Sequence, residues 1–270
     1  MSSSTKIIKM TSASNSKGEV TTNKIPVIGI VGHMLPNGNS MGATLPYITY
    51  FERFGDVKVI LPTSRVVDTT LDLLVIPGGP DISVTRYLNK KDRVSWFNQK
   101  PDNLREYFDV NILPKYIEEK IPVFGICRGH QSIAVLYGAK LEQDLIFHER
   151  SSEEKRWEVA HRTVLRKLEI DEEEKILTTT KYAVNIGTNS LHHQAVITVP
   201  DNAVVIAWTD EKLPKNSTVF PYDPGNKYHA IEGLAYTHAP IVTVQWHPEE
   251  MDTVEVFEII DDLIKCSPNF

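Results

Sequence analysis

Cysteine is scarce in this chain, which has only Cys127 and Cys266 among its 270 residues. The sequence contains no C-x-x-C pair and no Cys/His spacing typical of a metal site, so it predicts no zinc or other metal centre. Two cysteines in a chain of this length also favour a reducing compartment.

Long apolar runs are missing as well. No stretch approaches the roughly 20 apolar residues that a membrane span needs. Residues 1–24 are rich in Ser, Thr, Asn and Lys and lack the apolar core of a signal peptide. We therefore expect a disordered N-terminal tail on a soluble, cytoplasmic protein.

Positive charge does not dominate the chain either. The formal net charge is −6 and the sequence pI is about 5.9, which is not the basic footprint of a protein that binds nucleic acid or an anionic membrane. Residues 83–103 combine aromatic side chains with lysines and arginines, but in an acidic chain this pattern favours a solvated loop at the rim of a site. The expected partner is a small molecule.

The chain does contain an alternation of buried strands and amphipathic stretches. Its first half predicts strands at 25–31, 57–61, 73–76 and 121–126 and helices at 45–54 and about 102–119. This alternation is typical of a three-layer α/β/α sandwich with a mainly parallel central sheet. Because 41% of the residues are hydrophobic, residues 25–270 are expected to form a single domain.

The second half is expected to be richer in strands. Extended segments are predicted at 139–141, 157–165, 181–186, 203–208, 230–236 and 241–246, and a final helix at 254–264. Residues 209–226 form a polar loop with three prolines, for which we expect a role as a lid or a contact surface. In an open parallel sheet the active site should lie at the carboxyl ends of the strands.

Cys127 lies between a predicted strand and a predicted helix in the stretch 121–137, IPVFGICRGHQSIAVLY. The pattern G-x-C-x-G at such a junction is that of a nucleophile elbow with cysteine in place of serine. Gly125 and Gly129 would let neighbouring backbone pass close to the turn. The following helix N-terminus favours the thiolate. We therefore interpret Cys127 as a nucleophile and not as an inert core thiol.

A candidate base lies in the stretch 242–249, VTVQWHPE. A strand ends at His247 because Pro248 cannot continue the ladder. Taken alone, this pattern favours a surface histidine beside an acidic turn. A cysteine nucleophile, however, needs a base that a third group orients, and Glu249 follows two residues later. Together with Cys127, the pattern predicts a base and its orienting carboxylate.

A glycine turn follows the strand in the stretch 71–81, LDLLVIPGGPD. The backbone N–H groups of Gly78 and Gly79 can approach a ligand closely. Acyl transfer needs donors at the point where negative charge develops on the carbonyl oxygen. The N–H groups of Gly79 and Arg128 would form such a pair, although PGGP by itself also fits an ordinary strand-to-helix turn.

Taken in order, IPGGPD, GICRGHQ and VQWHPE resemble a class I glutamine amidotransferase domain. The stretch 189–196, NSLHHQAV, resembles the NSFHHQA segment of the γ-glutamyl-γ-aminobutyrate hydrolase branch, also called the peptidase C26 family. The resemblance runs from about Pro26 to the C-terminus. It implies a flavodoxin-like fold and a cysteine-dependent hydrolase that forms a glutamyl thioester without a metal or an organic cofactor.

The resemblance also implies roles for individual residues. Cys127 would be the nucleophile, His247 the base and Glu249 its partner, with an oxyanion hole formed by the backbone of Gly79 and Arg128. Four residues would lie near the γ-glutamyl group, namely Gly78, Gln131, His192 and His193. Adjacent histidines can bind a metal, but in an extended segment they point to opposite sides, so we expect one at the cleft and one toward the structure.

Three functions remain open at this point. The NSLHHQAV stretch and the absence of a fused synthetase favour a free-standing γ-glutamyl hydrolase. The spelling Gly129-His130-Gln131 fits the glutaminase component of an amidotransferase, which would pass ammonia to a synthetase partner. A binding protein without catalysis is the least favoured, because all three triad residues are present. Whether the chain forms a homodimer also stays open.

Overall fold

The computed structural model describes residues 24–35, 40–88, 100–145, 148, 150–210 and 229–270. The expected N-terminal tail, most of the basic loop at 83–103 and nearly all of the loop at 209–226 lie outside these residues. The remaining predictions can be compared with the structure element by element.

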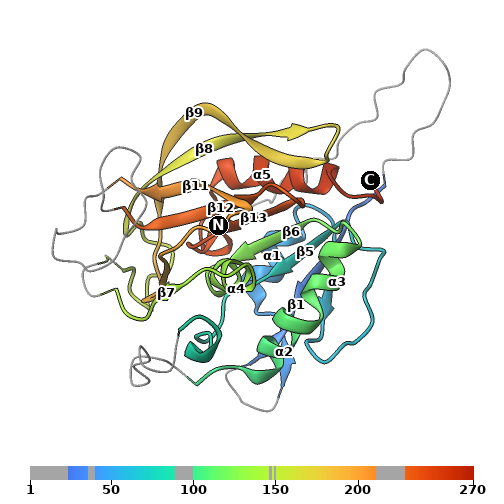
Figure 1. The fold of residues 1–270 in the computed structure, drawn as a ribbon, viewed down its shortest axis with the longest axis horizontal. Coiled ribbons are helices and arrows are strands. Elements are labelled where there is room, and N and C mark those ends of the chain that lie inside the picture. Colours follow the sequence, from blue (N-terminus) through green and yellow to red (C-terminus); the bar gives the residue numbers. More distant parts are fainter. Residues whose placement is uncertain (1–23, 36–39, 89–99, 146–147, 149, 211–228) are drawn as a thin grey trace, which may run out of the picture.

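In the described part of the chain, a nine-stranded sheet forms the centre of the molecule (Figure 1), with the strand order β4-β1-β5-β6-β13-β12-β11-β8-β9. The strands are β4 (Asp56–Ile60), β1 (Val27–Val31), β5 (Leu73–Ile76), β6 (Val123–Ile126), β13 (Ile241–Val244), β12 (Ile231–Tyr236), β11 (Ala203–Thr209), β8 (His161–Asp171) and β9 (Ile176–Thr188). Neighbours from β4 to β13 pair in parallel. Neighbours from β13 to β9 pair antiparallel.

Helices cover both faces of the sheet, which confirms the predicted three-layer α/β fold. Side chains of α1 (Leu45–Phe51) and α5 (Val254–Lys265) pack in one hydrophobic core with Leu73 and Val75 of β5. Side chains of α2 (Asn103–Asn111), α3 (Leu113–Glu118) and α4 (Arg128–Leu136) pack in a second core with Leu74 and Ile76. Successive residues of β5 thus enter opposite cores, because side chains alternate along a strand.

The helix predicted at about 102–119 is two helices, α2 and α3, which meet at Ile112. Asp102 caps α2 by accepting hydrogen bonds from the N–H groups of Leu104 and Arg105. Pro114 lies in the first turn of α3, where its missing N–H group costs nothing. The expected single helix is therefore interrupted just before the proline.

The segment after residue 157 differs most from its prediction. β8 begins at His161 and continues through the charged residues to Asp171, and β9 extends over 13 residues to Thr188. These two strands pair antiparallel at one edge of the sheet. Long charged side chains are tolerated there because one face of an antiparallel edge can meet water.

Two short strand pairs and two 3-10 turns complete the described elements. β2 (His33–Met34) pairs with β3 (Met41–Gly42), and β7 (Leu141–Glu142) pairs with β10 (Ala195–Val196). The turns are η1 (Val84–Arg86) and η4 (Pro248–Glu250). The β7–β10 pair holds the stretch 189–196 against the segment that follows α4.

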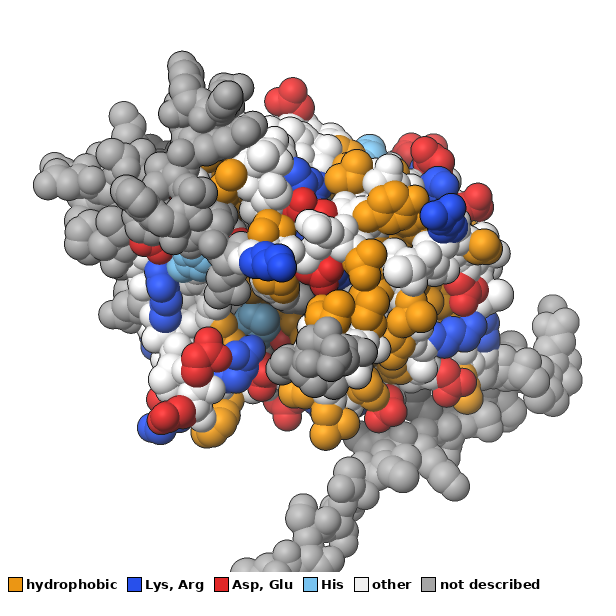
Figure 2. Space-filling model, turned by 90° about the horizontal axis from the view of Figure 1, so that it is seen from below, with side chains coloured by type: hydrophobic (Ala, Val, Ile, Leu, Met, Phe, Trp, Pro, Cys, Tyr) orange, Lys and Arg blue, Asp and Glu red, His pale blue; other side chains and the backbone are white. Residues whose placement is uncertain are grey.

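The surface shows no single charge sign on the face drawn in Figure 2, where acidic and basic side chains are interspersed among hydrophobic ones. Among the described residues, no helix is both long enough and apolar enough to cross a membrane.

A substitution on the buried side of α5 tests how the first core holds the fold. Ile260 is fully buried in this core, so Ile260→Ala should lower the free energy of unfolding by about 2 to 5 kcal/mol through lost contacts and a residual cavity. Glu258 is exposed on the same helix, and Glu258→Ala should change stability by less than about 0.5 kcal/mol. Equilibrium unfolding in urea measures both, and equal effects would place α5 outside the core.

Candidate active site

The strand order brings three predicted site segments together at the carboxyl ends of central strands. β5 ends at the PGGP turn, β6 ends at Cys127 and β13 leads to His247. These strands are parallel neighbours, β5 beside β6 and β6 beside β13. Their carboxyl ends therefore lie side by side, which is where the active sites of open α/β sheets are found.

Cys127 lies on a strained turn between β6 and α4. Its backbone has φ 50° and ψ −104°, a conformation that residues with a side chain rarely adopt. A Cβ on Gly129 would lie 1.9 Å from the carbonyl oxygen of Ile76, and one on Gly125 would lie 2.8 Å from Thr243 Cγ2. Only glycine fits at either position. The packing thus imposes the elbow geometry that the G-x-C-x-G pattern predicts.

His247 connects Cys127 with Glu249. Its Nδ1 lies 2.6 Å from Glu249 Oε1, and its side chain lies close enough to Cys127 for the thiolate charge to raise its pKa. Burial alone would lower the pKa of His247, but the negative charges of Glu249 and Cys127 raise it well above its usual value. The structure therefore brings together all three residues of the predicted triad, with the imidazole between a thiol and a carboxylate.

Two further residues hold His247 in place, one through its backbone and one beside its ring. The side chain of Asn189 accepts from the His247 N–H at 2.9 Å and donates to its carbonyl at 3.2 Å. The hydroxyl of Tyr47 lies 3.4 Å from His247 Nδ1 and accepts from the Gly78 N–H at 2.9 Å. The sequence offered only a partial signal for them, since Asn189 opens the NSLHHQAV stretch and Tyr47 lies within an ordinary amphipathic helix.

The predicted oxyanion donors lie beside the thiol. Arg128 is the first residue of α4, so its N–H group has no helical carbonyl partner. Gly79 and Arg128 line one pocket with Cys127. The N–H of Gly78 is already engaged with Tyr47, which leaves the N–H of Gly79 as the donor that the turn can offer.

A buried arginine supports the glycine turn from behind. The guanidinium of Arg105 donates to the carbonyl oxygens of Pro77 at 3.0 Å and Gly78 at 3.3 Å. Burial and the nearby charge of Arg128 lower the pKa of Arg105 to about 10. The turn is thereby held with its carbonyls toward a cation. No local pattern in the sequence indicates a role for Arg105, which is one of several charged residues in α2.

The side chain of Arg128 forms a buried ion pair. It lies 2.6 Å from Asp109, whose carboxylate also accepts from the Ser132 hydroxyl at 2.7 Å. The pKa of Asp109 is lowered: burial opposes this shift, but Arg128, Arg105 and Ser132 together outweigh it. This pair joins α2 to the first turns of α4 and fixes the helix N-terminus that faces the thiol.

A pocket opens beside Cys127 and contains three of the predicted substrate residues. It is lined by Gly79, Asp81, Cys127, Arg128, Gln131 and residues 191–194. His193 is partly buried, and its Nε2 lies 3.0 Å from Asp81. The hydrogen bonds to Asp81 and Asp144 raise its pKa against the opposing effect of burial.

The neighbouring histidine lies deeper in the protein. Both ring nitrogens of His192 have protein partners, the carbonyl oxygen of Gln194 at 2.9 Å and Nε2 of His148 at 3.1 Å. The side-chain amide of Gln131 donates to the same Gln194 carbonyl at 3.0 Å and to Gln245 at 3.2 Å. Gln131 and His192 therefore support the wall of the pocket, which both histidines line.

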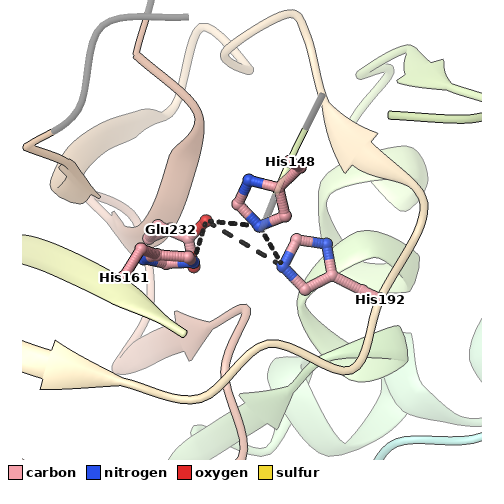
Figure 3. A group of neighbouring side chains, drawn as sticks. All are labelled: His148, His161, His192 and Glu232. Carbon is pink, nitrogen blue, oxygen red and sulfur yellow. Dashed lines mark hydrogen bonds and ion pairs between the residues drawn. The ribbon is translucent and has the colours of Figure 1, made fainter. Parts of the chain in front are cut away.

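Behind this wall lies a group that the sequence did not reveal. His148, His161, His192 and Glu232 are all buried and face one another (Figure 3). Burial lowers the pKa of His148 to about 3 and that of His161 to about 4, and it raises the pKa of Glu232 well above its usual value. These residues are so far apart in the sequence that no short spacing signals the group.

Comparisons with known proteins identify what this sequence is similar to. Residues 26–249 match the model of the family Peptidase C26. The glutamine amidotransferase-like protein YvdE of Lactococcus lactis subsp. lactis is 25% identical over 214 residues, which cover 75% of this chain and 78% of the relative. The γ-glutamyl-γ-aminobutyrate hydrolase PuuD of Escherichia coli K12 is 23% identical over 244 residues, which cover 83% of this chain and 85% of the relative.

The fold is also found among solved structures. The structure of PurLQS from Thermotoga maritima matches this chain with a TM-score of 0.54 at 12% sequence identity. The match covers 91% of this chain and 99% of the other. At this level of identity the likeness establishes a shared fold.

Removing the carboxylate beside His247 should lower the pKa of this imidazole. Glu249→Gln deletes the largest favourable charge, whereas Glu250→Gln, a control next to it, alters an ion pair with Arg156. Protonated His247 stabilises the folded protein fully below the unfolded pKa of about 6.5, and this stabilisation is lost as the pH rises through the folded pKa. An NMR titration of His247 should show a lower pKa in Glu249→Gln only; an unchanged value would remove Glu249 from its assigned role.

Proposed function

This chain belongs to the peptidase C26 family, and on that premise we propose that it is a cysteine-dependent hydrolase of the γ-glutamyl amide bond in a small γ-glutamyl compound. The family and the glutamine amidotransferase-like relatives support hydrolase chemistry. The likeness to a γ-glutamyl-γ-aminobutyrate hydrolase supports the γ-glutamyl substrate.

One observation carries the proposal, namely the connection of three groups at the ends of two neighbouring strands. Cys127 occupies a positive-φ turn. His247 lies close enough to the thiol for the charge of Cys127 to raise its pKa, and its Nδ1 lies 2.6 Å from Glu249 Oε1. A nucleophile, a base and an orienting acid in this order are the arrangement that nucleophilic acyl transfer uses.

In the first half-reaction, the thiolate of Cys127 attacks the carbonyl carbon of the γ-amide, and a carbon–sulfur bond forms. The carbonyl oxygen takes up negative charge, which the N–H groups of Gly79 and Arg128 stabilise. The carbon–nitrogen bond then breaks, and the protonated imidazole of His247 gives its proton to the departing amine. The product is a γ-glutamyl thioester on Cys127.

In the second half-reaction, a water molecule attacks the thioester carbon and gives a proton to His247. The same oxyanion donors stabilise the tetrahedral intermediate. The carbon–sulfur bond breaks, glutamate leaves, and the thiolate–imidazolium pair is restored. The raised pKa of His247 suits both halves, because the imidazole must hold a proton beside the thiolate before the amine departs.

The pocket beside Cys127 offers groups that could hold a glutamyl moiety. His193 and Asp81 lie at its wall, 3.0 Å apart. In this proposal His193 binds the α-carboxylate of glutamate and Asp81 its α-ammonium. Gln131 and His192 support this wall through the Gln194 carbonyl. The loops expected to contact the leaving amine, 83–103 and 209–226, lie mostly outside the described residues.

The alternative is the glutaminase component of an amidotransferase that delivers ammonia to a partner synthetase. The name of the Lactococcus lactis relative and the GHQ spelling after Cys127 favour it. Both functions use the same thioester chemistry. They differ in the leaving group, which is ammonia in one case and a larger amine in the other, and in the dependence on a partner.

Replacing the nucleophile should abolish turnover without unfolding the protein. Cys127→Ser is expected to lower kcat by at least about a thousandfold, because a serine hydroxyl is a far weaker nucleophile at neutral pH. Cys266→Ser is the matched control, since Cys266 lies at the end of α5 and burial raises the pKa of its thiol to about 11. Glutamate release is the measurement, and near-normal activity in Cys127→Ser would refute the assignment.

A substrate panel separates the two functions. The purified chain is incubated with glutamine, γ-glutamyl amines and γ-glutamyl peptides, and Cys127→Ser serves as the blank. Hydrolysis of a γ-glutamyl amine in preference to glutamine is the expected result and identifies the leaving group. Glutaminase activity that requires a co-purifying synthetase would establish the alternative instead.

A further inference from the structure

Four side chains converge behind the wall of the pocket. The ligand atoms of His148, His161, His192 and Glu232 all lie within 4.8 Å of one another. The exposed fractions of these residues are 8%, 4%, 4% and 0%. Figure 3 shows the three imidazole rings and the carboxylate arranged around a common space.

In two of the rings Nδ1 is hydrogen-bonded to another part of the protein, and Nε2 faces the other ligand atoms; Nε2 of His192 is hydrogen-bonded there to His148 Nε2 at 3.1 Å. His192 Nδ1 donates to the carbonyl oxygen of Gln194 at 2.9 Å, so its Nε2 is unprotonated in the neutral ring. His161 Nδ1 lies 3.1 Å from the Thr188 hydroxyl, and its Nε2 has no hydrogen-bond partner in the described part of the chain. Such bonds at the far nitrogen are how proteins orient metal-binding imidazoles.

Glu232 lacks the partners that a buried carboxylate needs. Its side chain is fully buried, and neither oxygen has a hydrogen-bond partner among the described residues. Oε1 lies 3.8 Å from His148 Nε2 and 3.9 Å from the Nε2 atoms of His161 and His192. These distances are too long for hydrogen bonds. An isolated buried carboxylate is costly, and a cation bound among the three imidazoles would offset that cost.

We propose that His148, His161, His192 and Glu232 bind a Zn²⁺ ion. Three imidazole nitrogens and one carboxylate oxygen make a complete four-coordinate donor set for zinc. Ligands about 2.0 to 2.1 Å from one ion at tetrahedral angles lie roughly 3.3 Å apart. Four of the six distances between the ligand atoms, 3.1 to 3.9 Å, bracket that spacing. All six lie within 4.8 Å, so an inward shift of the ligands, by up to about 1.5 Å for a pair at that limit, would bring them to it.

The donor set also indicates a structural site. All four ligands are buried and supplied by the protein, which is typical of closed zinc sites, whereas catalytic sites keep one position for water. Binding forms four coordinate bonds and releases any proton held by Glu232 or by the His148–His192 hydrogen bond. No redox step is involved.

The ion would connect four segments that are distant in the sequence. His161 begins β8, Glu232 belongs to β12, and His192 lies between β9 and β10, while His148 lies in the segment that follows β7. The carbonyl next to His192 in this network, that of Gln194, also accepts from Gln131, and His193 lines the pocket. The ion would thus fix the pocket wall in position without touching substrate.

The test uses the full chain, produced without a polyhistidine tag. Elemental analysis after purification should find about one zinc per chain. Removal with a chelator should lower the melting temperature, and added Zn²⁺ should restore it. Reconstitution with Co²⁺ should give the intense visible absorption of a tetrahedral ion. No retained metal, with no thermal shift on adding Zn²⁺, Co²⁺ or Ni²⁺, would overturn the proposal and leave a metal-free hydrogen-bonded group.

Matched variants locate the ion. His161→Gln and Glu232→Gln should each weaken zinc binding by more than about tenfold. His238→Gln, which alters a histidine bonded to Tyr137 and Asn202 outside the cluster, should bind zinc like the wild type. Zinc bound equally well by all three variants would place the ion elsewhere and refute the site.

X-ray absorption of the zinc-loaded wild type keeps the test valid if a variant fails to fold. Three imidazoles and one oxygen ligand are expected, and a sulfur ligand would overturn the proposal because it would point to Cys127. The inference does not rest on the proposed hydrolase activity. Cys127→Ser should bind zinc as the wild type does. Zinc binding therefore tests the metal site, and glutamate release tests the catalytic assignment independently of it.

Discussion

The close passage of α4 beside the end of β5 is the constraint on which the site depends. A Cβ at Gly129 would lie 1.9 Å from the carbonyl oxygen of Ile76, so the chain can turn from β6 into the helix only with glycine there. This packing holds Cys127 at φ 50°. The same contact places the PGGP turn beside the thiol, because that turn begins at the residue after Ile76.

Buried charges then set the electrostatics around this turn. Arg105 binds the carbonyl oxygens of the glycine turn, and Arg128 pairs with Asp109. Both guanidiniums lie close to the N-terminus of α4, which itself favours negative charge. The region that would receive an oxyanion is therefore positively polarised by fixed groups. Glu249 supplies the opposite charge on the far side of His247, so the proton on the imidazole is held between two negative groups.

Much of this arrangement could be predicted from the sequence because local patterns determine it. Apolar runs located β1, β5 and β6. The glycines around Cys127 indicated a turn at which neighbouring backbone passes too close for a larger side chain. His247 was marked by a strand that ends at a proline. Each signal lies within about ten residues of the side chain it concerns. Even the start of α2 near residue 102 was predicted, and Asp102 caps the helix there through a local hydrogen-bond pattern.

Features built from distant segments could not be predicted in this way. The charged residues after 165 concealed how far β8 extends. They are tolerated in a strand because β8 pairs with β9 and their side chains can meet water at this edge of the sheet. Tyr47 and Asn189 support His247 across 200 and 58 residues of sequence. The four residues of the proposed zinc site come from separate segments. Because no short spacing links them in the sequence, no motif indicated the site.

The sequence by itself determined the fold class, the three-layer arrangement and the candidate nucleophile, base and acid, because strand periodicity and turn chemistry act over short distances. Only the tertiary structure decided which neighbours surround these groups. It placed Arg105 under the glycine turn and Glu232 among three histidines. It also brought the side chain of Asn189 to the N–H and carbonyl groups of His247. The physical reason is that burial and charge pairing depend on which segments the sheet order brings together.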